Sequence, residues 1–446
     1  MRKVESVLGI LIICLFFSSL SFFIPKEIFL EPKFSKEPLL KENPLSEKKP
    51  AVYLDFFEKI RNNLIDSKEE FLEVNLQQMK IKVWVDGLLV KEVPILRKGD
   101  PQEWGGTAAG LCKVISKNRS SFSVIAGVYM PYSINFYGKY YIHGEPYYPG
   151  GKKLETEASG SCIQLSDENA KTIFELAKEE MPVLVIDKEK ENYQYPEAIT
   201  EFPEISAKSY LVADLDSGFV FAEKDSQKQF PIASITKLMT AIVVSENVDL
   251  RKSILVEKKM LEAYGSTKGL DAGKSFKVVE LFYPLLIESS NDAAEVLSYF
   301  LGREKTIKLM NEKAKAILME KTNFADPSGF DLKNVSTAQD LFYLGRYILN
   351  SRPLLFEIGK GKEVKSFGEI KFDIKNLWNK NVFINDPNFV GGKTGYLKEA
   401  GQTAIFIFRF GERNILISLL DSENIEIDTQ KIYKWLQENY FINYKP

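Results

Sequence analysis

The chain has 446 residues, of which 45% are hydrophobic and 27% charged, and a formal net charge of −2. This composition is that of a globular protein with about two or three domains, and no basic patch interleaved with aromatic residues indicates nucleic-acid binding. The single histidine, His143, excludes the usual zinc peptidases, which need two or three imidazole ligands. We therefore expect no metal and no other cofactor.

The N-terminal segment predicts where the chain resides. After Arg2 and Lys3, residues 7–24 form a run of 18 residues without a charge. That length suits an uncleaved membrane-spanning helix with everything after it outside the cytoplasm. The alternative is a cleaved signal, with Ser19-Leu-Ser21 as the small-residue cleavage site and secretion to the periplasm or wall.

The rest of the chain divides by composition into a tether, two domains and a linker. Prolines recur among lysines and glutamates in the tether, which cannot build a core. The first domain reads as strand-rich, whereas helical patterns alternate with strands in the second. The expected boundaries are 1–24 for the anchor or signal, 25–50 for the tether, 51–70 for a short helical segment, 71–187 for the first domain, 188–203 for the linker and 204–446 for the second domain.

The first domain contains a candidate thiol nucleophile, Cys162, and a candidate base, His143. An imidazole beside a thiol generates the thiolate that attacks a carbonyl, so we expect the pKa of Cys162 to lie well below about 8.5. The alternative is a buried free cysteine beside a satisfied histidine. Cys112 is expected to be a small buried residue, and a bridge from it to Cys162 would silence the nucleophile.

Around this pair the chain resembles the catalytic domain of the L,D-transpeptidases, which cross-link peptidoglycan through a cysteine. The match includes Met130-Pro-Tyr132, His143-Gly144 and Ser159-Gly-Ser-Cys-Ile-Gln-Leu165. The family has a histidine at Gly160, a glycine at Ser161 and an arginine at Gln164. The resemblance implies His143 as the base and Ser159 and Gly144 at the substrate, with an altered pocket.

Three motifs mark the second domain: Ser234-Ile-Thr-Lys237, Ser289-Ser-Asn291 and Lys393-Thr-Gly395. Lys237 lies one helical turn from Ser234 and can take its proton if it is neutral, which burial and the charge of Lys393 would favour. Ser289 can relay a proton to a leaving amine, and Asn291 can hold the substrate amide. Lys393 and Thr394 suit a carboxylate, and Gly395 leaves room for the substrate backbone along its strand.

The order of these motifs resembles that of the low-molecular-mass penicillin-binding proteins that act as D-alanyl-D-alanine carboxypeptidases. Further matching stretches are Phe230-Pro-Ile-Ala-Ser-Ile-Thr-Lys237, Asp326-Pro-Ser-Gly-Phe-Asp331 and Gly392-Lys-Thr-Gly-Tyr396. The resemblance implies acylation of Ser234, and an oxyanion hole from the backbone N–H groups of Ser234 and Tyr396. The Glu-x-x-Leu-Asn loop of a class A β-lactamase is missing from the sequence.

The sequence thus predicts a multidomain protein of the bacterial cell membrane. A β-rich L,D-transpeptidase-like domain precedes an α/β domain like that of penicillin-binding proteins and β-lactamases, with an antiparallel sheet, helices and a helical subdomain. The expected function is peptidoglycan remodelling on stem peptides, inhibited by β-lactams: a carboxypeptidase trims pentapeptides, and a transpeptidase uses the tetrapeptides. The alternative is a D,D-endopeptidase with a catalytically silent wall-binding module.

Overall fold

The computed structural model describes residues 52–54, 56–155, 160–262, 269–364 and 370–441. Every described residue belongs to one compact unit, Ala51–Pro446. The predicted anchor at residues 7–24 and the tether lie outside the described residues. Among the residues that are described, no helix has the length and apolar character needed to cross a membrane.

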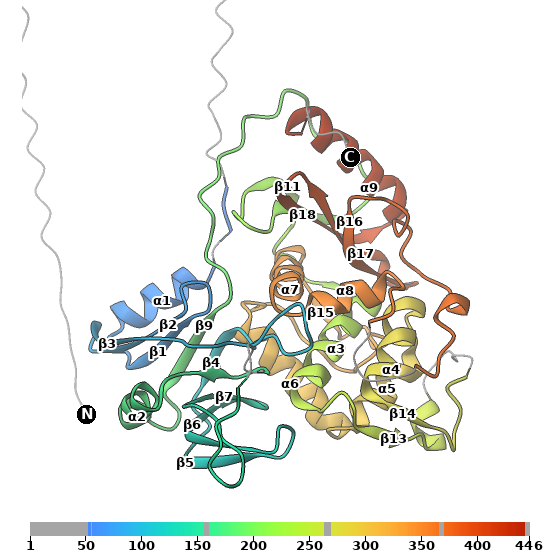
Figure 1. The fold of residues 1–446 in the computed structure, drawn as a ribbon. Helices are drawn as coiled ribbons and strands as arrows, with labels where there is room; N and C mark the ends of the chain where they lie inside the picture. The colour runs from blue at the N-terminus through green and yellow to red at the C-terminus, as the bar shows by residue number, and fades with distance from the viewer. Residues whose placement is uncertain (1–51, 55, 156–159, 263–268, 365–369, 442–446) are drawn as a thin grey trace, which may run out of the picture. The chain divides into compact units, whose positions relative to one another are not determined.

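In the described part of the first domain, two sheets pack with the helices α1 and α2 (Figure 1). One sheet has the strand order β3-β2-β1-β9-β4, and the other has the order β5-β6-β7-β8. All five residues of β1 are buried, because this strand lies inside its sheet between β2 and β9. The elements are α1 (Phe57–Asp66), β1 (Phe71–Asn75), β2 (Lys80–Val85), β3 (Leu88–Pro94), β4 (Gly110–Lys113), β5 (Ser116–Ser123), β6 (Val128–Tyr137), β7 (Tyr140–His143), β8 (Ile163–Gln164), α2 (Asp167–Leu176) and β9 (Pro182–Ile186).

The second domain is built on a five-stranded antiparallel sheet with the order β11-β10-β18-β17-β16. Alternate residues of β17 enter two different cores, Ile405 and Ile407 in one and Phe406 and Phe408 in the other. This period of two lets α7 and α9 cover opposite faces of the sheet. The sheet strands and these helices are β10 (Ser209–Asp214), β11 (Val220–Lys224), α7 (Ala338–Ser351), α8 (Pro353–Gly359), β16 (Phe389–Leu397), β17 (Gly401–Phe410), β18 (Arg413–Ser422) and α9 (Ile425–Asn439).

A helical subdomain is inserted between β11 and α7, as the sequence predicts. It contains α3, whose first turns carry the Ser-x-x-Lys motif, and α5, which begins at the second motif. Its elements are β12 (Phe230–Pro231), α3 (Thr236–Asn247), β13 (Ser253–Leu255), β14 (Ser275–Lys277), α4 (Val278–Tyr283), α5 (Asn291–Tyr299), α6 (Arg303–Ala316) and β15 (Val335–Ser336). Ser234 itself lies in a 3₁₀ turn, Ala233–Ile235, which leads directly into α3.

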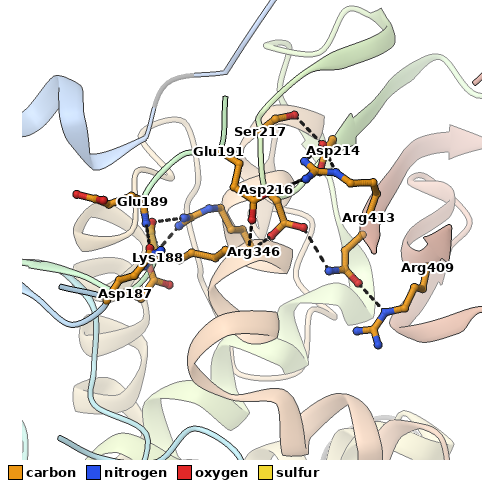
Figure 2. A network of polar contacts seen from close by, with 12 residues as sticks. Asp187, Lys188, Glu189, Glu191, Asp214, Asp216, Ser217, Arg346, Arg409 and Arg413 are labelled. Carbon is orange, nitrogen blue, oxygen red and sulfur yellow. Dashed lines mark hydrogen bonds and ion pairs between the residues drawn. The ribbon is translucent and has the colours of Figure 1, made fainter. Parts of the chain in front are cut away.

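The linker is fixed to the second domain by ion pairs (Figure 2). Arg346 on α7 lies 3.1 Å from Asp187, and both side chains are 6% exposed. Lys188 reaches Asp216 at 2.7 Å, and Arg413 on β18 contacts Asp214 and, at 2.5 Å, Glu191. The linker, which the sequence predicts to be a charged connector, is therefore bound to the second domain by ion pairs.

The two domains share a core and a buried polar interface. One hydrophobic cluster contains residues of both, such as Ile142 and Ile242. Arg352 donates to the Gly106 carbonyl at 2.7 Å and to the Tyr140 hydroxyl at 2.6 Å. Moving the domains apart would leave the buried Arg352 without these partners, which is strongly unfavourable.

Candidate active sites

Ser234 lies in a strained turn at the start of α3. The residue before it, Ala233, has a φ of 46°, a left-handed conformation that non-glycine residues rarely adopt. A Cβ at Gly329 would come within 1.9 Å of the Ala233 carbonyl oxygen, so only glycine fits beside this turn. Such strain persists where the surroundings hold it, and it is typical of functional sites.

The Lys237 amine has three partners. Its Nζ lies 3.0 Å from Ser234 Oγ, 2.7 Å from Asn291 Oδ1 and 2.5 Å from the Ser328 carbonyl oxygen. Two of these partners are carbonyl oxygens, which accept N–H bonds. A neutral amine that donates to both points its lone pair at the third partner, the Ser234 hydroxyl.

Burial favours that neutral state. Desolvation lowers the pKa of Lys237 to about 7, although Asp326 and Glu295 oppose it. The low pKa predicted from sequence is therefore found, and burial is its cause as predicted, whereas Lys393, the second predicted cause, is not among the groups that shift it. Desolvation first, and then repulsion from Lys237 and Lys380, instead lower the pKa of Lys393 well below its ordinary value.

The second motif follows an irregular turn. A π-type turn, Pro284–Glu288, ends at Ser289, whose φ of 65° is again left-handed. Ser290 then caps α5 by accepting a bond from the Ala293 N–H, so Asn291 occupies the first helical position. The Ser289 hydroxyl accepts a bond of 2.9 Å from Lys393 Nζ. The three motifs thus form one hydrogen-bonded group around Ser234.

The third motif lies on β16, which runs against the turn of Ser234. A Cβ at Gly395 would lie 2.8 Å from the Ser234 backbone nitrogen and 2.6 Å from Thr403 Oγ1. A side chain at this position would therefore meet the protein itself, which is a reason for this glycine besides the predicted room for the substrate backbone. Tyr396, the next residue, is 67% exposed.

The loop of Asp326 contributes to the site in a way that its sequence motif does not predict. The Asp326 carboxylate accepts bonds from the backbone N–H groups of Ser328, Gly329 and Asp331. This loop holds the Ser328 carbonyl that accepts from Lys237. A carboxylate followed by Pro-Ser-Gly signals such a loop, but not which carbonyl it presents.

An open cleft of about 1000 Å³ lies over Ser234. Thr394, Gly395, Ser289 and Asn291 line it together with more peripheral residues, among them Phe330, Trp378, Lys380 and Tyr396. Polar and apolar side chains thus line the cleft together, which suits an extended peptide.

The cysteine site follows from the pairing of β7 with β8. These strands are parallel, with Ile142 opposite Ile163 and His143 opposite Gln164. His143, the last residue of β7, lies opposite Gln164 and points to the same face of the sheet. Cys162 lies two positions before Gln164, so its side chain points to that face as well. Both residues line one cavity of about 450 Å³.

The electrostatics of this pair differ from the sequence-based expectation. Burial raises the pKa of the Cys162 thiol to about 11, although a backbone N–H and Lys139 oppose it. Burial also lowers the pKa of His143. The expected thiolate with a low pKa is therefore wrong for the free protein, which holds a neutral thiol and a neutral imidazole. Cys112 and Cys162 are both free.

His143 has one ring nitrogen committed to a backbone contact. Its Nδ1 lies 2.6 Å from the Gly144 carbonyl oxygen, so Nδ1 carries the proton and Nε2 is the basic nitrogen. Gly144 is packed tightly, since a Cβ there would lie 2.5 Å from Asp167 Oδ1. Gly160 and Ser161 line the cavity, as does Gln164, whereas Ser159 lies outside the described residues.

Comparison with known proteins supports both resemblances. The family model for D-alanyl-D-alanine carboxypeptidases, peptidase S11, matches residues 196–421, and that for the L,D-transpeptidase catalytic domain matches residues 69–185. A D-alanyl-D-alanine carboxypeptidase of Mycobacterium tuberculosis is 29% identical over 50% of this chain and 78% of its own. A D-alanyl-D-alanine endopeptidase of Haemophilus influenzae is 34% identical over 49% of this chain and 76% of its own.

Among solved structures, penicillin-binding protein D2 of Listeria monocytogenes in its cefotaxime-bound form is 28% identical over 53% of this chain and 99% of its own, with a TM-score of 0.46. The two-domain fold class expected from the sequence is confirmed by the two family matches. The carboxypeptidase model alone covers half of the chain. The chain therefore belongs to the D-alanyl-D-alanine carboxypeptidase family, peptidase S11.

Proposed function

We propose that the chain trims and then cross-links peptidoglycan stem peptides at two sites. The serine site releases the terminal D-alanine of a pentapeptide, and the cysteine site uses the resulting tetrapeptide as its acyl donor. The observation that carries the proposal is the geometry of Lys237. Its amine donates to two carbonyl oxygens, so its lone pair points at Ser234, and its pKa of about 7 favours the neutral state that has this lone pair.

At the serine site, Lys237 takes the hydroxyl proton while Ser234 Oγ attacks the carbonyl of the penultimate D-alanine. Ser289, bonded to Lys393, passes a proton to the amine of the departing D-alanine. Water then hydrolyses the ester on Ser234. Asn291 and Thr394 hold the peptide, and the N–H groups of Ser234 and Tyr396 stabilise the oxyanion.

At the cysteine site, His143 Nε2 takes the thiol proton as Cys162 Sγ attacks the carbonyl of the third stem residue. The terminal D-alanine leaves with a proton, and an acceptor amine then attacks the thioester and frees the thiol. Because the resting thiol is neutral, proton transfer accompanies attack instead of preceding it. Fusion of the domains raises the local concentration of tetrapeptide near Cys162.

A D,D-endopeptidase is the second candidate for the serine site. The relative at 34% identity carries that name. The cleft of about 1000 Å³ is also open, which allows a cross-linked peptide to enter it.

Product analysis tests these assignments. The full-length protein is incubated with pentapeptide, tetrapeptide and cross-linked muropeptides, and the products are identified by mass. We expect D-alanine release from pentapeptides, and cross-linking or exchange at the third residue of tetrapeptides. Cys162→Ala and His143→Ala should each remove the second activity and leave the first intact.

Two outcomes would overturn parts of this proposal. Cleavage of cross-links faster than D-alanine release would identify an endopeptidase. Tetrapeptides that stay unchanged with the wild-type protein, while D-alanine is released from pentapeptides, would identify the first domain as a silent module.

We also propose that residues 7–24 anchor the chain in the bacterial cell membrane, with both domains outside the cytoplasm. The protein is expected to stay in the membrane fraction through alkaline carbonate washing and to migrate at full mass. The matched control is a variant with arginine at Leu11 and Ile12, which should leave the membrane fraction. A mature N-terminus at Phe22, found by terminal sequencing, would instead show a cleaved signal.

A further inference from the structure

The cavity around Cys162 is closed on one side by the other domain. Most of its lining comes from the first domain, including Ile125, Val128 and Met130. The remaining wall is Asp249, Leu250 and Arg251, in the turn that follows α3 of the second domain. The site of one nucleophile is thus completed by residues of the domain that carries the other.

This wall is fixed in place by direct contacts. Lys139, in the turn between β6 and β7, donates from Nζ to the carbonyl oxygens of Ser245 at 2.8 Å and Val248 at 3.0 Å. These carbonyls end α3, where a cation is favourable. The neighbouring Gly138 approaches so closely that a Cβ would lie 2.7 Å from Asn247 Oδ1. These contacts hold Asp249, Leu250 and Arg251 in place as part of the pocket lining.

Arg251 carries a guanidinium on this wall in a defined orientation. Its Nε lies 3.0 Å from Asp249 Oδ1, and its Nη2 lies 2.8 Å from Asp249 Oδ2. Asp249 thus occupies the side edge of the guanidinium. Among the described residues, no bond is formed by its end edge, the Nη1 group and the outer N–H of Nη2. The side chain is 51% exposed.

We propose that Arg251 binds the terminal carboxylate of the stem peptide that enters the cysteine pocket. The end edge of a guanidinium presents two parallel N–H groups, which match the two oxygens of a carboxylate. The inference rests on the proposed function in one respect: the ligand is a peptide that ends in a free carboxylate. It makes the cysteine site a composite of both domains.

Binding to an inactive protein tests this inference apart from turnover. The Ser234→Ala/Cys162→Ala protein is titrated by calorimetry with a synthetic tetrapeptide stem and with its C-terminal amide, each made with lysine and with diaminopimelate at the third position. The free acid should bind about tenfold more tightly than the amide, as expected for a charge-assisted hydrogen bond. Arg251→Gln should remove this preference, and Arg251→Lys should restore part of it.

Arg409 offers a matched control. It is an exposed arginine on β17, bonded to Asn414 at 3.3 Å, and Arg409→Gln should keep the preference for the acid (Figure 2). In the active protein, Arg251→Gln should raise KM for tetrapeptide with little change in kcat, and leave D-alanine release at Ser234 unchanged.

The outcomes separate the inference from the function on which it rests. Acid-selective binding that needs Arg251, without exchange in the active protein, would support the inference and contradict the transpeptidase activity. Exchange that continues with an unchanged KM in Arg251→Gln would contradict the inference alone. No binding, or a preference for the acid that persists in Arg251→Gln, would also contradict it.

Discussion

Alanine at position 237 is expected to lower the rate at which penicillin acylates the protein by about 10²–10⁴-fold, the usual contribution of general-base assistance. Ser234→Ala should abolish acylation and D-alanine release, since it removes the hydroxyl that forms the ester. The reason is the contact between Lys237 Nζ and Ser234 Oγ at 3.0 Å. Fluorescent penicillin with rapid quenching measures the rates.

The pH dependence gives a second check on the same residue. Burial lowers the pKa of Lys237 to about 7, so below that pH the amine carries a proton and cannot act as a base. The acylation rate should therefore rise as the pH rises through about 7 and level off above it, and Lys237→Ala should lack this step. Lys308→Ala, at an exposed lysine on α6, is the control and should keep both rate and profile. An unaltered rate in Lys237→Ala would contradict this role.

Glu246→Ala is expected to lower the free energy of unfolding by about 3–5 kcal/mol, the typical effect of removing one partner from a buried ion pair. Glu246 is fully buried at the end of α3. It lies 3.1 Å from Lys313 Nζ and 2.9 Å from Arg352 Nη2, which are 0% and 4% exposed. Desolvation alone would raise its pKa, but these two cations hold the pKa below its ordinary value.

The effect should extend to the domain interface, because both cations also bond to the first domain. Lys313 donates to the Ala109 carbonyl at 3.2 Å, and Arg352 donates to Gly106 and Tyr140. Guanidinium unfolding measures the loss. Glu312→Ala, at an exposed glutamate 3.7 Å from Lys308, should cost less than about 1 kcal/mol. Equal small losses in the two variants would show that the buried cations do not depend on Glu246.

The sequence predicts best what depends on local spacing. Lys237 is three residues from Ser234, and a helical turn brings their side chains together whatever surrounds them. Only the resemblance to a known family predicts that Ser289, Asn291 and Lys393 join them. Contacts between residues so far apart along the chain leave no periodic signal in the sequence. The sequence does not predict that the Ser328 carbonyl accepts a bond from Lys237, because every residue has a backbone carbonyl and none has a sequence signature.

The errors share a physical cause, which is burial by distant segments. The pKa of Cys162 was expected to fall because His143 is near, yet desolvation raises it to about 11. The sequence likewise does not predict that a side chain at Gly395 would meet Ser234 and Thr403, because these contacts depend on the fold. The sequence does not predict a role for Arg251, because its position in the lining of the cysteine pocket depends on how the two domains pack.

Peptide mapping of the penicillin adduct shows whether Ser234 is the acylated nucleophile of this chain. The full-length protein is incubated with penicillin, digested and mapped by mass spectrometry. We expect one penicilloyl adduct, on the peptide that contains Ser234, and its loss in Ser234→Ala. An adduct on another residue, or labelling that persists in Ser234→Ala, would contradict it.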